Sequence, residues 1–288
     1  MKTSTKKQNP PKGGTLTEEQ IKWLNECTEG TWKLNHQTGL VDVEGDFDCS
    51  GQDLSDFKGV RFGVVERHFS CSDNRLTSLE GAPREVGRSF NCDDNLLTSL
   101  EGAPQKVRGG FSCHNNRLTS LEGAPREVGW SFWCHNNRLT SLEGAPQKVW
   151  SFDCNDNRLT SLEGAPRKVR GNFYCYNNRL TSLVGAPEKV GRRFDCSHNL
   201  LTSLEGAPRK VGWSFCCESN PVPERTLKSI FSLMQEGASY EEALREKWKR
   251  YSHKTKSLLY RAEYQWIPQE EHKMLSALNK VNSVLNWI

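Results

Sequence analysis

The chain contains eleven cysteines, the residue type here that could take part in the most kinds of chemistry. Cysteines can pair in disulfides, and a Cys-x-x-Cys spacing can hold zinc, but the sequence contains no Cys-x-x-Cys pair. A regular spacing favours a structural role for these cysteines over a reactive one. Nine of the eleven recur at intervals of 20 to 22 residues: Cys49, Cys71, Cys92, Cys113, Cys134, Cys154, Cys175, Cys196 and Cys217.

The geometry of such a column argues against both cross-linking and metal binding. Thiols on successive parallel strands would lie in a row about 4.8 Å apart, whereas the Cβ atoms of a disulfide prefer about 3.8 Å. A straight row also cannot supply the tetrahedral cage that zinc prefers. We therefore predict that the nine cysteines pack in the core as small apolar side chains. Cys216 is one place outside the column, and we expect it to be the most exposed thiol.

Histidine is the second residue type that could carry chemistry. His114 and His135 hold the same position in adjacent repeats, so a two-histidine metal site is conceivable, but the sequence shows no third ligand. The sequence also lacks a His-Glu-x-x-His pair, a Gly-x-Ser-x-Gly elbow, a Walker loop and a dinucleotide fingerprint. We therefore predict a protein that is not an enzyme and that has no catalytic residues, metal or other cofactor.

The cysteines belong to an internal repeat that runs from Phe69 to Asn220 and reads F-x-C-x-x-N-x-L-T-S-L-E-G-A-P-x-x-V. A degenerate copy precedes it, with Phe47 and Cys49 in the two leading positions, which makes nine strand units. Successive asparagines are 21 residues apart except for one interval of 20, where a residue is missing between Val149 and Phe152. The asparagines are Asn74, Asn95, Asn116, Asn137, Asn157, Asn178, Asn199 and Asn220.

This period predicts a stacked coil. Phe and Cys are two residues apart in each copy, so they point to the same side of a short strand, and stacked copies form a parallel sheet. The leucines, alanine and valine of each copy would fill the other walls. The Asn has both donor and acceptor groups to satisfy the backbone where the chain leaves the strand. No copy can bury its apolar side alone, so stability must come from its neighbours.

The pattern F-x-C-x-x-N-x-L resembles L-x-L-x-x-N-x-L of the leucine-rich-repeat family, in the short form found in bacterial and phage-encoded arrays. The resemblance covers residues 46–220, with Phe-x-Cys in place of Leu-x-Leu and E-G-A-P where many bacterial effectors carry L-P-x-L-P. It implies an α/β-type solenoid with a parallel β-sheet on its concave face. It also implies recognition of a protein partner through that face, as in a bacterial or phage-encoded effector or adaptor.

The segments outside the array predict caps. Residues 1–14 indicate a disordered polar tail, and residues 15–45 an N-terminal cap made of a helix over 15–27 and a β-hairpin over 31–43. Residues 221–288 indicate a C-terminal helical region that covers the last strand unit. Its end carries a short a/d seam that we expect to pack on the preceding helices of a monomer: Met274, Leu278, Val281, Leu285 and Ile288.

The variable strand positions carry the best functional signal. The residues between Phe and Cys and directly after Cys should face outward, and these columns are polar at both ends and aromatic in the middle. Clustered aromatics on a surface usually mark a binding site. The alternative is drift among near-identical copies with no partner. The predicted partner-binding residues, which we expect to face solvent in one continuous patch, are Trp130, Trp133, His135, Trp150, Tyr174 and Tyr176.

Composition sets the remaining limits. Only 35% of the residues are apolar, the mean hydropathy is −0.71, and no apolar run is long enough to cross a membrane. The first residues lack the apolar stretch of a signal peptide, so we expect a cytoplasmic, reducing location.

Charge leaves a second function open. The net charge is +4, and residues 245–261 hold seven Lys or Arg against one Glu, so the remainder is close to −2 and predicts no basic groove. The alternative function is therefore nucleic-acid association through this segment. Its candidate residues are Lys247, Lys249, Arg250, Lys254 and Lys256.

Overall fold

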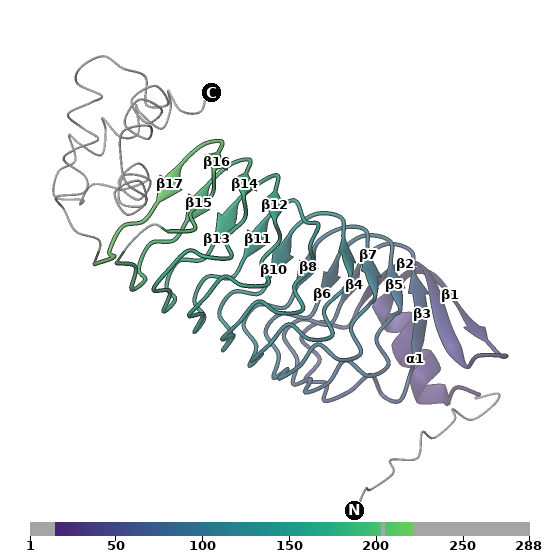
Figure 1. The fold of residues 1–288 in the computed structure, drawn as a ribbon. Helices are drawn as coiled ribbons and strands as arrows, with labels where there is room; N and C mark the ends of the chain where they lie inside the picture. Colours follow the sequence, from purple (N-terminus) through teal and green to yellow (C-terminus); the bar gives the residue numbers. More distant parts are fainter. Residues whose placement is uncertain (1–14, 203–204, 222–288) are drawn as a thin grey trace, which may run out of the picture.

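The computed structural model describes residues 15–202 and 205–221. Within them the chain winds into an elongated coil, with a helix and a hairpin at one end (Figure 1). Each turn of the coil corresponds to one copy of the repeat. Short parallel strands of successive copies stack to make two ladders along the coil.

The first ladder, which we call the Phe ladder, contains the phenylalanine of every copy. It pairs equivalent residues, so that Phe132 lies between Phe111 and Phe152. The predicted nine strand units are therefore present, and the copy shortened by one residue stays in register. The nine strands are β2 (Leu40–Asp48), β4 (Phe69–Ser70), β6 (Phe90–Asn91), β8 (Phe111–Ser112), β10 (Phe132–Trp133), β11 (Phe152–Asp153), β13 (Phe173–Tyr174), β15 (Phe194–Asp195) and β17 (Phe215–Cys216).

The second ladder, which we call the Val ladder, runs through the valine of each copy and was not predicted. At the shortened copy it is reduced to an isolated bridge between Val149 and Val169, which separates its two halves. The first half joins the Phe ladder through β2, and the second half is a sheet of its own. The strands are β3 (Phe62–Val65), β5 (Glu85–Val86), β7 (Lys106–Val107), β9 (Glu127–Val128), β12 (Lys168–Val169), β14 (Lys189–Val190) and β16 (Lys210–Val211).

The core is a stack of phenylalanine rings. Rings of neighbouring copies lie 5.1 to 5.6 Å apart, centroid to centroid, and are nearly parallel. The nine cysteines lie beside them and are all buried, as predicted. Their thiols also find acceptors, because Cys113 Sγ donates to the carbonyl of Trp133 at 3.4 Å and most other copies repeat this bond.

The repeated asparagine closes the strand end. Asn137 Nδ2 donates to the carbonyl oxygens of Cys113, Cys134 and His135 at 3.0, 3.2 and 3.2 Å. Its Oδ1 accepts from the backbone N–H of Leu118 at 2.9 Å. One buried amide therefore satisfies four backbone groups on two neighbouring copies, which is the role that the sequence predicted for this residue.

The N-terminal helix and hairpin are confirmed, with longer strands than expected. Helix α1 (Glu18–Cys27) begins after Thr17, whose side chain forms a capping box with Gln20. Strand β1 (Thr28–Asn35) pairs antiparallel with β2, which continues directly into the first unit of the Phe ladder. The buried Trp23 of α1 packs edge-on against Phe47 at 5.3 Å.

The α/β class needs correction for the described residues, where α1 is the one helix. The reason is local. Five residues, Glu80 to Arg84, join the leucine wall of a copy to its Val strand, and equivalent segments recur in later copies. Gly81 in this turn has a φ of +92°, and Pro83 follows it, so a helix cannot form there. The array is a β-solenoid.

Three predictions fall on residues outside the described ranges: the tail over 1–14, the C-terminal helical region beyond Pro221, and its a/d seam. In the ranges that the structure does describe, no helix has the length and apolarity needed to cross a bilayer.

Candidate functional site

The outward side chains of the Phe ladder form the candidate site. We call this the Phe-ladder surface and define it as the position between the Phe and the Cys of each copy together with the position directly after the Cys. Four of the predicted partner-binding residues lie on it: Trp133, His135, Tyr174 and Tyr176. All four are half-buried, so the expectation that they face solvent freely was too simple.

The other two predicted residues lie elsewhere in the coil. Trp130 and Trp150 come two residues before their phenylalanines, between the two ladders, and are 69% and 42% exposed. They are neighbours, because the Trp150 N–H donates to the carbonyl of Trp130 at 2.5 Å. Among the described residues, no ring contact joins them to Trp133 or to the tyrosines. The structure thus separates the predicted patch into two groups.

The position of Trp133 depends on the preceding copy. A Cβ atom placed on Gly110 would lie 2.5 Å from the Trp133 ring, so the indole lies directly over this glycine. Other copies carry Asp, His, Ser, Asn or Arg at the same position. Gly110 therefore supplies the space in which Trp133 is half-buried.

A pair of variants tests this packing. Gly110→Ala should lower the free energy of unfolding by about 1 kcal/mol, because the new methyl group displaces the indole. In a Trp133→Ala background the same change should leave the free energy of unfolding almost unchanged, because the backbone conformation at Gly110 is one that an ordinary L residue adopts. Chemical denaturation of the four proteins of this cycle measures the coupling. An equal loss of stability in both backgrounds would mean that the backbone requires glycine at this position and that the space for Trp133 does not.

A row of titratable groups crosses the same surface on four successive rungs. His114 Nδ1 lies 3.9 Å from Asp93 Oδ1, and the rings of His114 and His135 lie 4.4 Å apart. His135 Nδ1 lies in turn 3.6 Å from Asp153 Oδ2. The order along the ladder is therefore carboxylate, imidazole, imidazole, carboxylate.

The pKa shifts of this row favour uncharged groups. Burial raises the pKa of Asp153 to about 7, and only 18% of its side chain is exposed. Burial, followed by the proximity of His114, lowers the pKa of His135. Their contact is therefore not an ion pair at neutral pH, and among residues 15–202 and 205–221 the buried His135 Nδ1 has no hydrogen-bond partner. In the part of the chain that the structure describes, no ion pair joins Asp153 to a lysine or an arginine.

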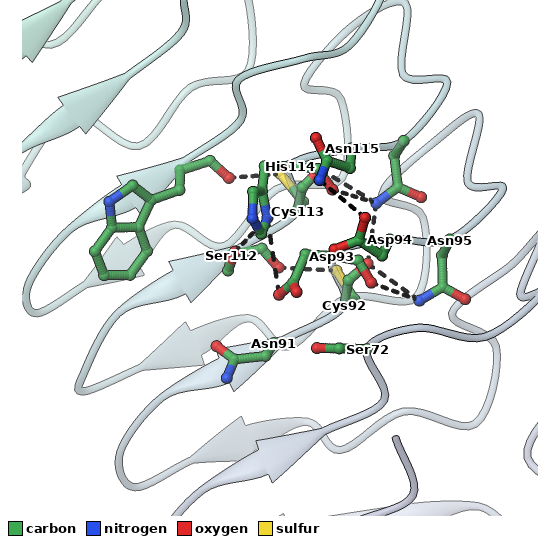
Figure 2. A network of polar contacts seen from close by, with 12 residues as sticks. Ser72, Asn91, Cys92, Asp93, Asp94, Asn95, Ser112, Cys113, His114 and Asn115 are labelled. Carbon is green, nitrogen blue, oxygen red and sulfur yellow. Dashed lines mark hydrogen bonds and ion pairs between the residues drawn. The ribbon is translucent and has the colours of Figure 1, made fainter. Parts of the chain in front are cut away.

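The neighbouring Ser112, His114 and Asp93 do not form a catalytic relay. Ser112 Oγ lies 3.0 Å from His114 Nδ1, and Asp93 faces the same nitrogen (Figure 2). In a Ser-His-Asp triad the serine and the carboxylate engage opposite ring nitrogens. This set therefore cannot pass a proton from the serine through the ring to the carboxylate.

Over the residues that it describes, the structure does not add a third ligand to the conceivable site of His114 and His135, but it places His114 beside two carboxylates of the preceding copy. Ligand atoms of Asp93, Asp94 and His114 lie within 4.8 Å of one another (Figure 2), and carboxylate with imidazole suits divalent transition metals. Two of the three are already engaged, however. Asp94 Oδ1 accepts from Asn115 Nδ2 at 2.8 Å, and His114 bonds Ser112. The protein's own hydrogen bonds account for this cluster.

Cys216 is the most exposed of the cysteines, as predicted, but it is still buried. This residue does point away from the Phe and Cys core, but it is only 6% exposed. Its small side chain is surrounded by neighbours that include Asp195 and Arg193 of the preceding copy, and burial raises its pKa to about 11. A thiol of this kind is a poor nucleophile at neutral pH.

Sequence reasoning missed two residues of this region. Trp213 is 58% exposed and holds the same V-G-W-S-F position as Trp130, a signal that was readable in the repeat. In the sequence, Asp153 is one more polar residue in its column, and the sequence does not show that its side chain is largely buried. The alternative nucleic-acid residues, from Lys247 to Lys256, lie outside the described residues.

The geometry is that of a parallel β-solenoid with a period of about 21 residues, and its repeat is similar to the leucine-rich repeat. Among solved structures the chain is similar to YopM, a leucine-rich effector protein from Yersinia pestis. The similarity has 20% sequence identity and a TM-score of 0.47, and it covers 61% of this chain and 49% of YopM. The chain thus spans about half the length of that structure. No family model and no curated protein matches the chain.

Proposed function

We propose that this chain is a non-catalytic protein-binding module, and that its Phe-ladder surface recognises an arginine side chain of a partner protein at Asp153. The observation that carries the proposal is the register of three strands. Trp133 pairs with Asp153, and Asp153 pairs with Tyr174, so the carboxyl group has an aromatic residue on the rung to either side. Tyr176 is a T-shaped neighbour of Tyr174 at 6.3 Å.

The electrostatics of Asp153 favour a cationic ligand. Its carboxyl group is held in a poorly solvated place where burial raises its pKa to about 7, and its nearest base, His135, tends to be neutral. A guanidinium group would bring the missing positive charge and donate hydrogen bonds to the carboxylate. Its flat face can also stack on tyrosine or tryptophan rings.

The aromatic residues would provide most of the remaining binding energy. Tryptophan and tyrosine bury a large area at a small entropic cost, and together with arginine they dominate the hot spots of protein interfaces. Trp133, Tyr174 and Tyr176 are already half-buried against the ladder, so little of their freedom remains to be lost when a partner binds.

The test compares Asp153→Asn with Asn91→Ala, a control in the same column at the polar end of the ladder. Wild-type and control proteins, immobilised, should recover the same partner from an extract of the native host. Asp153→Asn should bind that purified partner about 10 to 100 times more weakly, because a charge-assisted hydrogen bond is lost. Trp133→Ala should weaken binding by at least about 30-fold.

Two further measurements make the result decisive. Modifying the arginines of the partner with a dicarbonyl reagent should abolish binding to the wild-type protein, whereas acetylating its lysines should not. Thermal melting of each variant at the binding pH confirms that the fold is kept. Undiminished binding by Asp153→Asn, or by the arginine-modified partner, would contradict the proposed recognition.

A further inference from the structure

The outward column of the Val ladder changes character along the coil. The residue before each valine reads Glu85, Lys106 and Glu127 in the first half, and then Lys148, Lys168, Lys189 and Lys210 in the second. In the first half the signs alternate, and Lys106 Nζ lies 3.7 Å from Glu127 Oε2. In the second half Lys168 pairs in register with Lys189, and Lys189 with Lys210.

Folding alone gives no reason for this row of lysines. Strands of one sheet lie about 4.8 Å apart, and like charges directly opposite one another are destabilising. Within the described residues, no ion pair involves Lys148, Lys168 or Lys189, and all three side chains are exposed. The alternation in the first half shows that this ladder accepts glutamate equally well.

More cations gather around the row. The four copy segments 146–150, 166–171, 187–192 and 208–213 contain one acidic residue, Glu188. Against it stand eight basic residues: Lys148, Arg167, Lys168, Arg170, Lys189, Arg192, Arg209 and Lys210. The net charge of +7 exceeds the +4 of the whole chain. The expectation that the rest of the chain offers no basic groove rested on a sum of charges over the whole chain, and such a sum does not show that these basic residues recur at equivalent positions of the coil.

Exposed tryptophans border this basic surface. Trp150 and Trp213, which are 42% and 58% exposed, lie in the column between the two ladders, and Arg192 stands between them. The guanidinium carbon of Arg192 lies 6.0 Å from the Trp150 ring centre and 5.1 Å from that of Trp213. The Trp150 ring packs over Gly171, where a Cβ atom would come within 2.8 Å of it. The rings are therefore held near the lysines.

We propose that this surface binds single-stranded nucleic acid. The phosphates would follow the row from Lys148 to Lys210, and unpaired bases would stack on Trp150 and Trp213. A positively charged track with aromatic platforms beside it is the arrangement that proteins use for single strands. Four rungs span about 14 Å, which is enough for a few nucleotides. This surface lies on the Val ladder and shares no residue with the Phe-ladder surface.

The test measures binding of the full chain to a fluorescein-labelled oligothymidylate of twenty nucleotides by fluorescence anisotropy. With four phosphate contacts, the wild-type affinity should fall about 50-fold between 50 and 200 mM salt. The double variant Lys168→Glu/Lys189→Glu should bind at least tenfold more weakly. Its matched control is Arg84→Glu/Arg126→Glu, the same charge change at exposed positions of the first half, which should stay within twofold of wild type.

Stacking is tested separately from charge. Trp213→Ala should weaken oligonucleotide binding at least about fivefold and leave the binding of heparin, a polyanion without bases, unchanged. Retained binding by Lys168→Glu/Lys189→Glu would place the site elsewhere in the chain and overturn the proposal. Equal losses in both double variants, an unaffected Trp213→Ala, or a duplex bound as tightly as the single strand would also overturn it. None of these results bears on the arginine site at Asp153.

Discussion

Replacing Asn137 with alanine is expected to lower the free energy of unfolding by about 3 kcal/mol, and the melting temperature by about 6 to 12 °C. The amide makes four hydrogen bonds to backbone groups of two neighbouring copies. Its removal leaves the N–H of Leu118 and the carbonyl of Cys113 buried without this partner, and each unsatisfied group costs about 1 to 3 kcal/mol. Chemical and thermal denaturation of the full chain measure the loss.

The control for this experiment is the next residue along the chain. Arg138 is exposed, and its backbone N–H bonds the carbonyl of Leu118 whatever its side chain is. Arg138→Ala should therefore change the free energy of unfolding by less than about 0.5 kcal/mol. If both variants melted at the same temperature, the assignment of the inside and outside of the coil would be wrong at this position.

Asp153 should give the protein an unusual dependence of stability on pH. Its pKa is about 7 in the folded chain against an ordinary 3.8, so between these values the folded state holds a proton that the unfolded state has released. Stability due to this group is complete below about pH 4 and is lost as the pH rises to 7. The loss is on the order of 4 kcal/mol, and above pH 7 no more is lost.

Asp153→Asn removes this titration and should flatten the pH profile. The variant should be more stable than wild type at pH 8, and the difference should vanish or reverse near pH 4. His135 acts with the opposite sign, because a lowered folded-state pKa costs stability at low pH and the cost disappears as the pH rises. His135→Asn in both backgrounds separates the two groups. Parallel pH profiles of wild type and Asp153→Asn would mean that Asp153 has the same pKa in the folded and the unfolded protein, so that burial does not raise it.

The parts of the fold that could be predicted are those that the sequence repeats. Phe and Cys recur two residues apart in every copy, so their common direction into the core follows from strand geometry, and the structure buries them all. The asparagine recurs at a fixed distance from them, and its bonding role follows from its chemistry. The Val ladder was missed because two-residue strands are too short to show an alternating pattern.

The parts that could not be predicted depend on contacts between particular copies. Trp133 is half-buried because the preceding copy has Gly110, and the repeat pattern averages such a difference away. Burial of Asp153 and Cys216 depends on which side chains stand on the neighbouring rungs. The row of lysines is visible in the sequence, but its meaning requires knowing that Lys168 and Lys189 share a ladder.

The shortened copy has a consequence for how the array holds together. Elsewhere each copy is coupled to the next through both ladders, but around Val149 the Val ladder shrinks to a single bridge while the Phe ladder continues. In a quasi-one-dimensional body, cooperativity depends on the coupling between nearest neighbours. The coupling between neighbouring repeats is therefore weakest in the segment between the repeat that contains Glu127 and the repeat that contains Lys168. The solenoid would divide there into two folding units.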